Sequence, residues 1–306
     1  MPIPAGARAL LAFLVSVFPL LAAPAAPAHA QQRASSAVRA APASFRVMTF
    51  NIRYNNPDDG ENAWPRRAEG VGGLIRFHDP DLVGLQEAQR NQLDDLQRLL
   101  PGYAWFGQPR SDGGPGDEHS AILYRTDRFE LLRQGTFWLS ETPDVPRSKG
   151  WDAALPRIAT WGRLRDRATG DTILYLNTHF DHRGVRARAE SARLLKRWLA
   201  ANAGKLPVVV TGDLNTTPGS EPIAALVDAA TPPRLQDAIR ISAEPPYGPG
   251  STWNGFRAIV PDQRIDYVFV GDGLRVLEHG TLAETLDGVH YPSDHLPVLA
   301  EIVVQR

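Results

Sequence analysis

Short apolar runs recur along the chain from residue 45 onward, and they predict β-strands. Several of them, such as residues 173–176 and 208–210, are apolar at every position. That pattern is typical of strands covered on both faces, by a second sheet or by helices. The predicted strands are 45–52, 82–86, 121–124, 129–137, 160–164, 173–179, 208–213, 265–270 and 297–304.

Apolar residues at helical spacing predict three helices between these strands. Segment 65–78 begins with Pro65, which suits the first turn of a helix, and it places Val71 and Ile75 on one face. Segment 186–202 has an apolar stripe opposite Arg and Lys residues, which we interpret as a solvated face rather than a nucleic-acid surface. The third helix is predicted at 92–100. Strands alternating with helices in one continuous stretch indicate a single α/β domain.

The first thirty residues resemble a secretion signal rather than part of a fold. Arg8 precedes an apolar run over 9–23, and Ala28-His29-Ala30 has the small residues of a cleavage site. The run is short for a membrane span, so we favour a cleaved signal over an uncleaved anchor and expect no stable span in the mature chain. We therefore expect a signal peptide at 1–30, a flexible leader at 31–43 and a folded domain at 44–306, acting in the periplasm or outside the cell.

The composition of the chain argues against several kinds of functional site. The 306 residues include 33 Lys and Arg against 34 Asp and Glu, a formal net charge of −1. This balance argues against a broad basic surface for duplex DNA. The chain contains no cysteine, which excludes disulfides, thiolate catalysis and cysteine metal sites. We expect the protein to be a monomer.

Polar and acidic side chains recur where the predicted apolar strands end. Any one of them could be an ordinary turn or cap residue, but six such endings favour a shared site at one rim of the sheets. They are Asn51, Glu87, His179, Asp213 with Asn215, Asp266, and Asp294 with His295. Carboxylate and amide oxygens suit Mg²⁺ or Mn²⁺ better than zinc, which prefers His and Cys. Asp266 is the natural carboxylate to orient His295 and raise its pKa.

These endings, taken in order, resemble the motifs of the endonuclease/exonuclease/phosphatase superfamily, whose members include DNase I. The matching motifs are Asn51, Gln86-Glu87, Asn177-Thr178-His179, Gly212-Asp213-Leu214-Asn215, Arg264-Ile265-Asp266-Tyr267 and Ser293-Asp294-His295. The resemblance implies a four-layer αββα sandwich, in which two packed, mostly antiparallel mixed sheets are flanked by helices. It also implies a divalent-metal-dependent phosphoesterase, in which water attacks phosphorus in line.

The resemblance further implies a role for each matching residue. Glu87, Asn51 and Asp294 would hold the metal, and Asp213 would activate the attacking water. The remaining members would position the water or contact the phosphate: Asn215, His295 with its partner Asp266, His179 and Asn177.

Three further residues are candidate substrate contacts. Arg157 resembles a phosphate-binding arginine of the superfamily, with a surface salt bridge as the alternative. His119 precedes a strand and could line the site or simply lie in a loop, and Tyr54 follows Asn51 closely. We assign His78, His182, His279 and His290 to solvated or capping positions. For Trp64, Trp138, Trp151 and Trp253, core packing is favoured over stacking on a substrate.

The substrate is the least determined feature. The stretch before Asp266 lacks the cysteine of the inositol 5-phosphatase signature, whereas the segments 212–218 and 291–295 resemble the deadenylase and nocturnin branch. Secreted bacterial members are the group that the chain resembles most. We expect hydrolysis of a phosphodiester in a nucleic acid, nucleotide or lipid head group. The alternatives are a phosphomonoesterase for small organic, sugar or inositol phosphates and, less favoured, a non-catalytic binding module.

Overall fold

The computed structural model describes residues 2 and 44–305. Apart from residue 2, the expected signal peptide (1–30) and leader (31–43) lie outside the described residues. Residues 44–305 belong to one compact unit. No helix among the described residues is long and apolar enough to cross a membrane.

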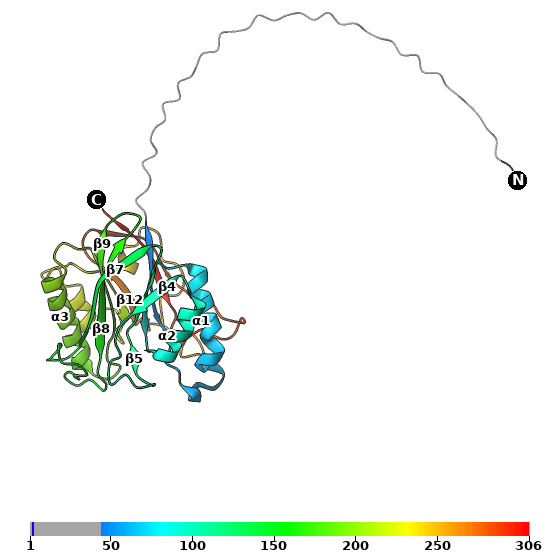
Figure 1. Ribbon diagram of the computed structural model, residues 1–306, viewed down its shortest axis with the longest axis horizontal. Helices are drawn as coiled ribbons and strands as arrows, with labels where there is room; N and C mark the ends of the chain where they lie inside the picture. Colours follow the sequence, from blue (N-terminus) through cyan, green and yellow to red (C-terminus); the bar gives the residue numbers. More distant parts are fainter. Residues whose placement is uncertain (1, 3–43, 306) are drawn as a thin grey trace, which may run out of the picture. The chain divides into compact units, whose positions relative to one another are not determined.

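Two mixed sheets pack face to face in residues 44–305 (Figure 1). The first has the order β13-β14-β1-β2-β6-β4, with β1 Phe45–Asn51, β2 Leu82–Gln86, β4 Tyr103–Phe106, β6 Ile122–Arg125, β13 Leu274–Thr281 and β14 Val298–Val304. The second has the order β11-β12-β10-β9-β8-β7, with β7 Phe129–Trp138, β8 Ile158–Asp166, β9 Thr172–His179, β10 Val208–Asp213, β11 Gln236–Asp237 and β12 Asp266–Val270. The β1–β2 and β9–β10 pairs are parallel, and the other pairs in these sheets are antiparallel.

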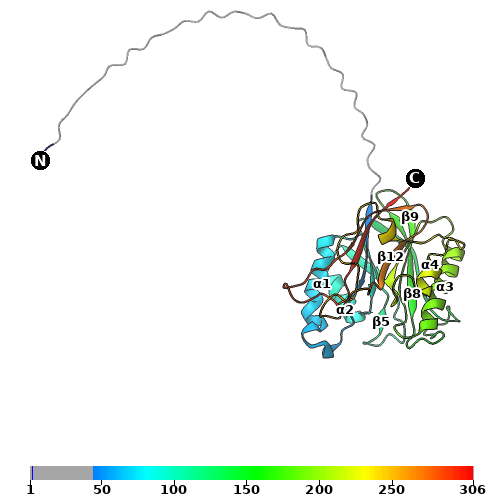
Figure 2. The ribbon, with the colours of Figure 1, turned by 180° about the vertical axis from the view of Figure 1, so that it is seen from behind.

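Helices cover the outer faces of both sheets. Helices α1 (Trp64–His78) and α2 (Arg90–Leu99) lie on one side, and α3 (Val185–Asn202) with α4 (Glu221–Leu226) lies on the other (Figures 1 and 2). The described chain also has a 3-10 helix η1 (Pro57–Asn62), the short helix α5 (Ala238–Ile241), and a small sheet of β3 (Ala88–Gln89) and β5 (Glu118–His119). Three apolar clusters fill the spaces between the layers. The expected four-layer αββα sandwich is confirmed.

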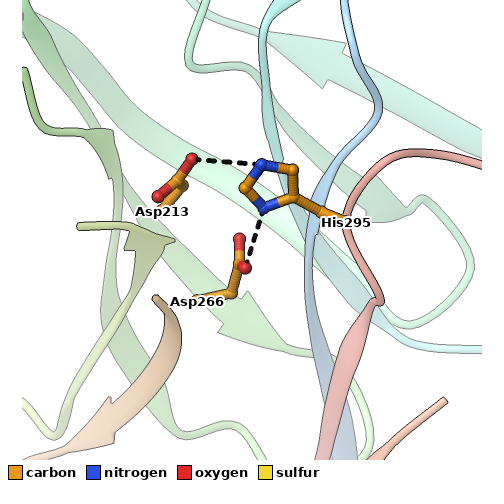
Figure 3. Close-up of side chains that lie close together, drawn as sticks. All are labelled: Asp213, Asp266 and His295. Carbon is orange, nitrogen blue, oxygen red and sulfur yellow. Dashed lines mark hydrogen bonds and ion pairs between the residues drawn. The ribbon is translucent and has the colours of Figure 1, made fainter. Parts of the chain in front are cut away.

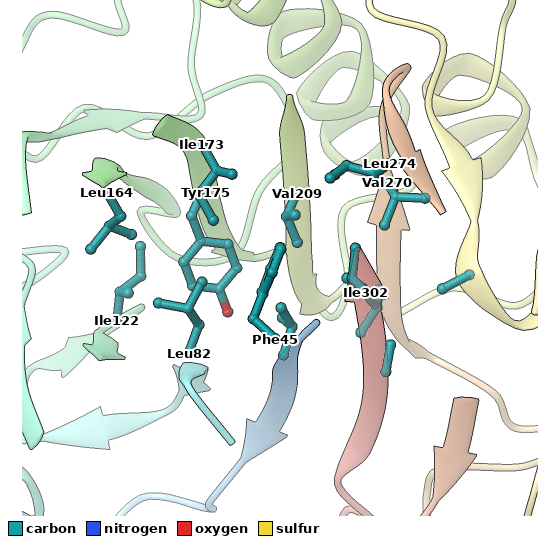
Figure 4. Close-up of a cluster of buried hydrophobic side chains, with 14 of the residues drawn as sticks. Phe45, Leu82, Ile122, Leu164, Ile173, Tyr175, Val209, Val270, Leu274 and Ile302 are labelled. Carbon is teal, nitrogen blue, oxygen red and sulfur yellow. The ribbon is translucent and has the colours of Figure 1, made fainter. Parts of the chain in front are cut away.

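Apolar side chains fill the space between the two sheets. Phe45, Leu82 and Ile122 of the first sheet share one buried cluster with Tyr175 and Val209 of the second (Figure 4). Alternating positions of each strand therefore face the opposite sheet, as the two-sided apolar runs predicted.

A buried polar seam joins the sheets beside this cluster. Gln86 Nε2 donates to Asn177 Oδ1 at 2.7 Å, and Thr211 Oγ1 donates to the same oxygen at 3.1 Å. Asn177 Nδ2 donates in turn to the carbonyls of Leu85 and Ala121. The expectation that Asn177 binds substrate is therefore wrong, because its fully buried amide is occupied in joining the two sheets.

Gly84 lies against this seam, and replacing it by alanine should be costly. A Cβ at this position would lie 2.3 Å from Thr211 Oγ1 and 2.5 Å from Asn177 Oδ1. We expect Gly84→Ala to lower the free energy of unfolding by about 3 kcal/mol, because neither polar atom can move without losing its hydrogen bonds. Urea unfolding measures this, with Gly102→Ala as the control, since a Cβ there would meet no atom of the described residues within 4 Å. Equal effects of the two substitutions would contradict this account of the seam.

Strand β13 is absent from the sequence prediction. It pairs with β14 along its length, but the register shifts between Val276 and Glu278. The extra residue interrupts the alternation of apolar and polar positions that would mark a strand. His279 of this strand is buried, so its assignment to a solvated or capping position is wrong.

The polar face of α3 also differs from the expectation. Lys196 was expected on a solvated face, but only 3% of it is exposed. Its ammonium group donates to the carbonyls of Asp228, Thr231 and Pro233. Lys196 thus holds the segment after α4 against the helix, because the aliphatic stem packs inside while the charge is satisfied by backbone oxygens.

Candidate active site

The polar residues at the strand ends meet at one edge of the two sheets. Strands β9 and β10 are parallel, so His179 lies opposite Asp213 in register. Strand β12 runs antiparallel to β10, so its first residue, Asp266, also lies opposite Asp213. In the first sheet, β1 and β2 are parallel and Asn51 lies opposite Gln86, which places Glu87 next to it. Strand direction alone thus brings these ends together.

His295 crosses from the first sheet to the acids of the second (Figure 3). It lies just before β14, and its Nδ1 is 2.9 Å from Asp266 Oδ2 while its Nε2 is 3.8 Å from Asp213 Oδ2. All three side chains are buried. The imidazole therefore forms a chain with one carboxylate on each side.

Burial and charge shift the pKa of both partners in this chain. Burial lowers the pKa of His295, but the charges of Asp266 and Asp213 outweigh it and raise that pKa well above its ordinary value. Burial and the charge of Asp266 raise the pKa of Asp213. His295 is thus held as an imidazolium that can donate from Nε2, and Asp213 is a stronger base than an exposed aspartate.

Asn51 links the two acids that come from different sheets. Its Nδ2 donates to Glu87 Oε1 at 3.1 Å and to Asp213 Oδ2 at 3.0 Å. Its Oδ1 accepts from the backbone N–H of Arg53 at 3.0 Å. In this arrangement Asn51 positions both carboxylates, and its oxygen is not presented as a metal ligand.

Glu87 is held in an unusual backbone conformation. Its φ is +60°, a left-handed value that costs energy for a residue with a long side chain. The backbone N–H of Tyr54 donates to Glu87 Oε2 at 3.1 Å. Tyr54 therefore contacts the site through its backbone N–H. Its ring lies against the Arg53 guanidinium, whose central carbon is 4.4 Å from the ring centre.

The donors at this edge fit a hard divalent cation. Asp213, Asp266 and His295 each offer an atom within 4.8 Å of the others, but the imidazolium form of His295 cannot bind a metal. Glu87 and Asp294 offer carboxylate oxygens instead. Burial and the nearby charge of Glu87 raise the pKa of Asp294, although His295 opposes them. A bound cation such as Mg²⁺ would reduce the repulsion between these neighbouring carboxylates.

His179 and Asn215 complete the cluster on the second sheet. Asn215 has a left-handed φ of +48°, which asparagine tolerates, and its backbone N–H donates to Asp213 Oδ1 at 2.9 Å. Its side-chain amide lies 3.0 Å from His179 Nε2. Burial and the charges of Arg157 and Arg110 lower the pKa of His179 well below its usual value. His179 is therefore a neutral imidazole at pH 7.

Arg157 is buried, so the alternative of a surface salt bridge is wrong. Its Nε donates to Asp181 Oδ2 at 3.3 Å, and its Nη2 lies 2.9 Å from His182 Nδ1. Its Nη1 has no hydrogen-bond partner among the described residues. His182, expected to be merely solvated, is thus partly engaged by Arg157.

His119 is also buried and lies beside the cluster. Its Nδ1 is 3.0 Å from the carbonyl of Ala88, and it lines a small hollow together with His179 and Arg157. The structure therefore brings both Arg157 and His119 next to the predicted phosphate-binding histidine.

Arg67 and Ser293 support the site. Ser293 is part of a matching motif, whereas Arg67 is absent from the residues predicted from the sequence. Arg67, 1% exposed, donates from α1 to the carbonyls of Ile52 and Pro292 at 3.0 and 2.7 Å. Ser293 Oγ donates to the carbonyl of Asn51 at 2.7 Å. One clue was visible in the sequence, since Arg67 falls on the apolar face of its helix, four residues before Val71.

Trp64 and Trp138 are buried, as expected for core residues. Trp253 differs, since 36% of it is exposed and its backbone forms an antiparallel bridge with His295. One indole is therefore available to solvent beside the cluster.

Residues 48–295 match the Endonuclease/Exonuclease/phosphatase family. Among solved structures, an endonuclease/exonuclease/phosphatase from Bacteroides vulgatus is 38% identical, with a TM-score of 0.81 over 86% of this chain and 100% of that one. A mannosyl-6-phosphatase from Bacteroides thetaiotaomicron is also 38% identical, with a TM-score of 0.80 over 85% of this chain and 100% of that one.

More distant relatives are nocturnins. Nocturnin of Drosophila melanogaster is 26% identical over 251 residues, which are 77% of this chain and 37% of that protein. The chain thus spans little more than a third of that relative. Together with the geometry above, the match over residues 48–295 shows that this chain belongs to the endonuclease/exonuclease/phosphatase family, a family of phosphoesterases.

Proposed function

We propose that this protein is a divalent-metal-dependent phosphomonoesterase that acts on a small organic phosphate. The observation that carries the proposal is the convergence of Glu87, Asp213 and His295, which come from both sheets, on one buried edge. A carboxylate that can hold a metal, a carboxylate of raised pKa and a charged imidazole are the groups that attack of water on a phosphate ester requires.

Each residue has a defined task in this reaction. Asp213 takes a proton from the attacking water as its oxygen bonds to phosphorus. The bond from phosphorus to the ester oxygen breaks, and the leaving oxygen takes a proton from solvent to give the free alcohol. His295 donates from Nε2 to a phosphoryl oxygen, and Asp266 holds its ring in place. Asn215 and His179 fix the position of Asp213 and of the phosphate.

Glu87 and Asp294 would hold the metal, which we propose is Mg²⁺ or Mn²⁺. Such an ion supplies a positive charge that stabilises the phosphoryl and leaving oxygens. Asn51 donates to both Glu87 and Asp213. It thereby keeps the proposed metal ligand and the proposed base in a fixed relative position.

The choice of a monoester is supported by the mannosyl-6-phosphatase, which is 38% identical to this chain and matched over its whole length. The sequence alone had favoured a diester. That second candidate keeps support from the CCR4-Not complex 3'-5'-exoribonuclease subunit of Emericella nidulans, which is 20% identical to this chain. The monoester has the stronger support, because the mannosyl-6-phosphatase is more similar to this chain than the exoribonuclease subunit is.

We also propose that the protein acts outside the cytoplasm. The support is the apolar run over 9–23 followed by Ala28-His29-Ala30. Cell fractionation of the full chain tests this, and a mature protein that remained in the cytoplasm would contradict it.

A panel of phosphate esters tests the reaction. With Mg²⁺ or Mn²⁺, we expect hexose 6-phosphates and p-nitrophenyl phosphate to be hydrolysed at least about tenfold faster than bis-p-nitrophenyl phosphate or a dinucleotide, measured as kcat/KM. EDTA should abolish turnover by the unmodified protein, and added Mg²⁺ should restore it. Added Mg²⁺ should not restore turnover in the Glu87→Gln variant. Faster diester cleavage would favour the second candidate, and turnover that ignores EDTA would refute the metal dependence.

A further inference from the structure

A small hollow lies beside His179 and extends the proposed active site. Its volume is about 10 Å³, which is roughly the space for one water-sized group. It is lined by Arg110, Glu118, His119, Ser120, Arg157, Ile158 and His179. The space suits one small polar group, about the size of a water molecule or a hydroxyl.

Arg110 and Glu118 form a two-point ion pair at this hollow. Arg110 Nη1 and Nη2 donate to the two carboxylate oxygens of Glu118 at 2.7 and 2.8 Å. Both side chains are largely buried, at 12% and 13% exposure. Trp138 Nε1 also donates to the carbonyl of Arg110 at 2.8 Å, which fixes the backbone of the arginine.

The same pair is tied directly to the proposed metal-binding residue. Glu118 and His119 form β5, which pairs with β3, and β3 begins at Ala88, immediately after Glu87. In register, Ala88 lies opposite His119 and Gln89 lies opposite Glu118. Backbone pairing therefore holds Glu118 beside the segment that directly follows Glu87.

Arg157 supplies an unused donor on another wall of the hollow. Its Nε and Nη2 are engaged by Asp181 and His182. Its Nη1 is buried and unpartnered among the described residues. A buried donor without an acceptor is costly, so an acceptor oxygen from a ligand would stabilise it.

The charged side chains around the hollow are already paired, which favours a neutral polar ligand over an anionic one. Arg110 is neutralised by Glu118, and Arg157 is paired with Asp181. A second anionic group would lie against the Glu118 carboxylate and be repelled by it. A hydroxyl group can bind to the donor and to the acceptor at once. Its oxygen can accept a hydrogen bond from Arg157 while its O–H donates to Glu118.

We infer that Arg110, Glu118 and Arg157 form a hydroxyl-binding subsite that recognises the alcohol part of the substrate. The substrate class is then a phosphate ester of a polyhydroxylated alcohol, such as a sugar phosphate, rather than a nucleic acid or a second phosphate. This inference rests on the proposed function, because it names the leaving alcohol of that reaction.

The experiment compares substrates with and without hydroxyl groups. For the full chain with Mg²⁺, the quantity measured is kcat/KM for mannose 6-phosphate divided by kcat/KM for phenyl phosphate. We expect this ratio to fall about tenfold or more in Glu118→Gln and in Arg110→Gln, because phenyl phosphate has no hydroxyl to lose. The double variant should lose about as much as either single variant, since the pair acts as one unit.

Arg125→Gln is the matched control, because Arg125 makes a similar two-point pair with the exposed Asp127. Its ratio should equal that of the unmodified protein. A ratio unchanged in the Arg110 and Glu118 variants, or equal losses on both substrates, would overturn the subsite and indicate a structural role. If the unmodified protein hydrolyses no monoester but cleaves diesters, the proposed function itself fails, and the subsite fails with it.

Discussion

Replacing Asp213 by asparagine should lower kcat about 10³-fold, which corresponds to about 4 kcal/mol in the barrier. The substitution keeps the size of the side chain but removes the only group that we assign to accept the proton of the attacking water. It also removes one of the two carboxylates beside His295. Steady-state kinetics on the preferred monoester measures the loss, and KM should change far less than kcat because the side chain acts mainly in the transition state.

The control for this prediction is Asp127→Asn, which changes an exposed aspartate in the same conservative way. It should keep full activity. Circular dichroism and thermal unfolding of Asp213→Asn show whether the fold is kept, since Asp213 Oδ1 accepts from the Asn215 backbone. If a folded Asp213→Asn retained more than about a tenth of kcat, Asp213 could not be the base.

Replacing Arg67 by methionine should cost about 4 kcal/mol of unfolding free energy, a large value for one residue. The guanidinium donates to the carbonyls of Ile52, Arg53, Asn62 and Pro292, all of which would lose a charged donor. Burial lowers the pKa of Arg67 to about 10, so it remains charged near neutral pH. Methionine fills a similar volume without any donor, so the loss measures the hydrogen bonds rather than a cavity.

Urea unfolding measures this cost, and Arg76→Met is the matched control because Arg76 is an exposed residue of the same helix. We expect the control to change stability by less than about 0.5 kcal/mol. Activity of Arg67→Met should also fall, since Arg67 holds the segments that carry Asn51 and Asp294. A loss of unfolding free energy below about 1 kcal/mol would show that the hydrogen bonds from Arg67 to these carbonyls contribute little to stability.

The sequence was sufficient to predict the layers of the fold and most members of the cluster. Apolar runs indicated the strands. Polar residues directly after these runs indicated one rim, because the ends of neighbouring strands in a packed sheet lie close together. Glu87, His179, Asp213 and His295 were all found in this way. In the structure both histidines lie close to Asp213, and Asn51 joins Glu87 to Asp213.

The partners of the individual side chains could not be predicted from the sequence. Asn177 lies two residues before His179 in the same strand, and nothing in its surroundings along the chain shows that its amide is occupied across the sheets. Lys196 likewise carries a charge that normally indicates solvent, but three carbonyls from a distant segment satisfy it. Such contacts depend on tertiary packing, which propensity and periodicity do not contain.

The order of the strands has one further consequence for this protein. Asn51, Glu87 and His295 lie at or just beyond strand ends of one sheet, whereas His179, Asp213 and Asp266 lie in strands of the other. Neither half could hydrolyse an ester alone, however completely its own ladder of backbone hydrogen bonds had formed. Turnover in a newly made chain therefore begins only when the two halves have docked, and a partly assembled molecule contributes nothing to the measured rate.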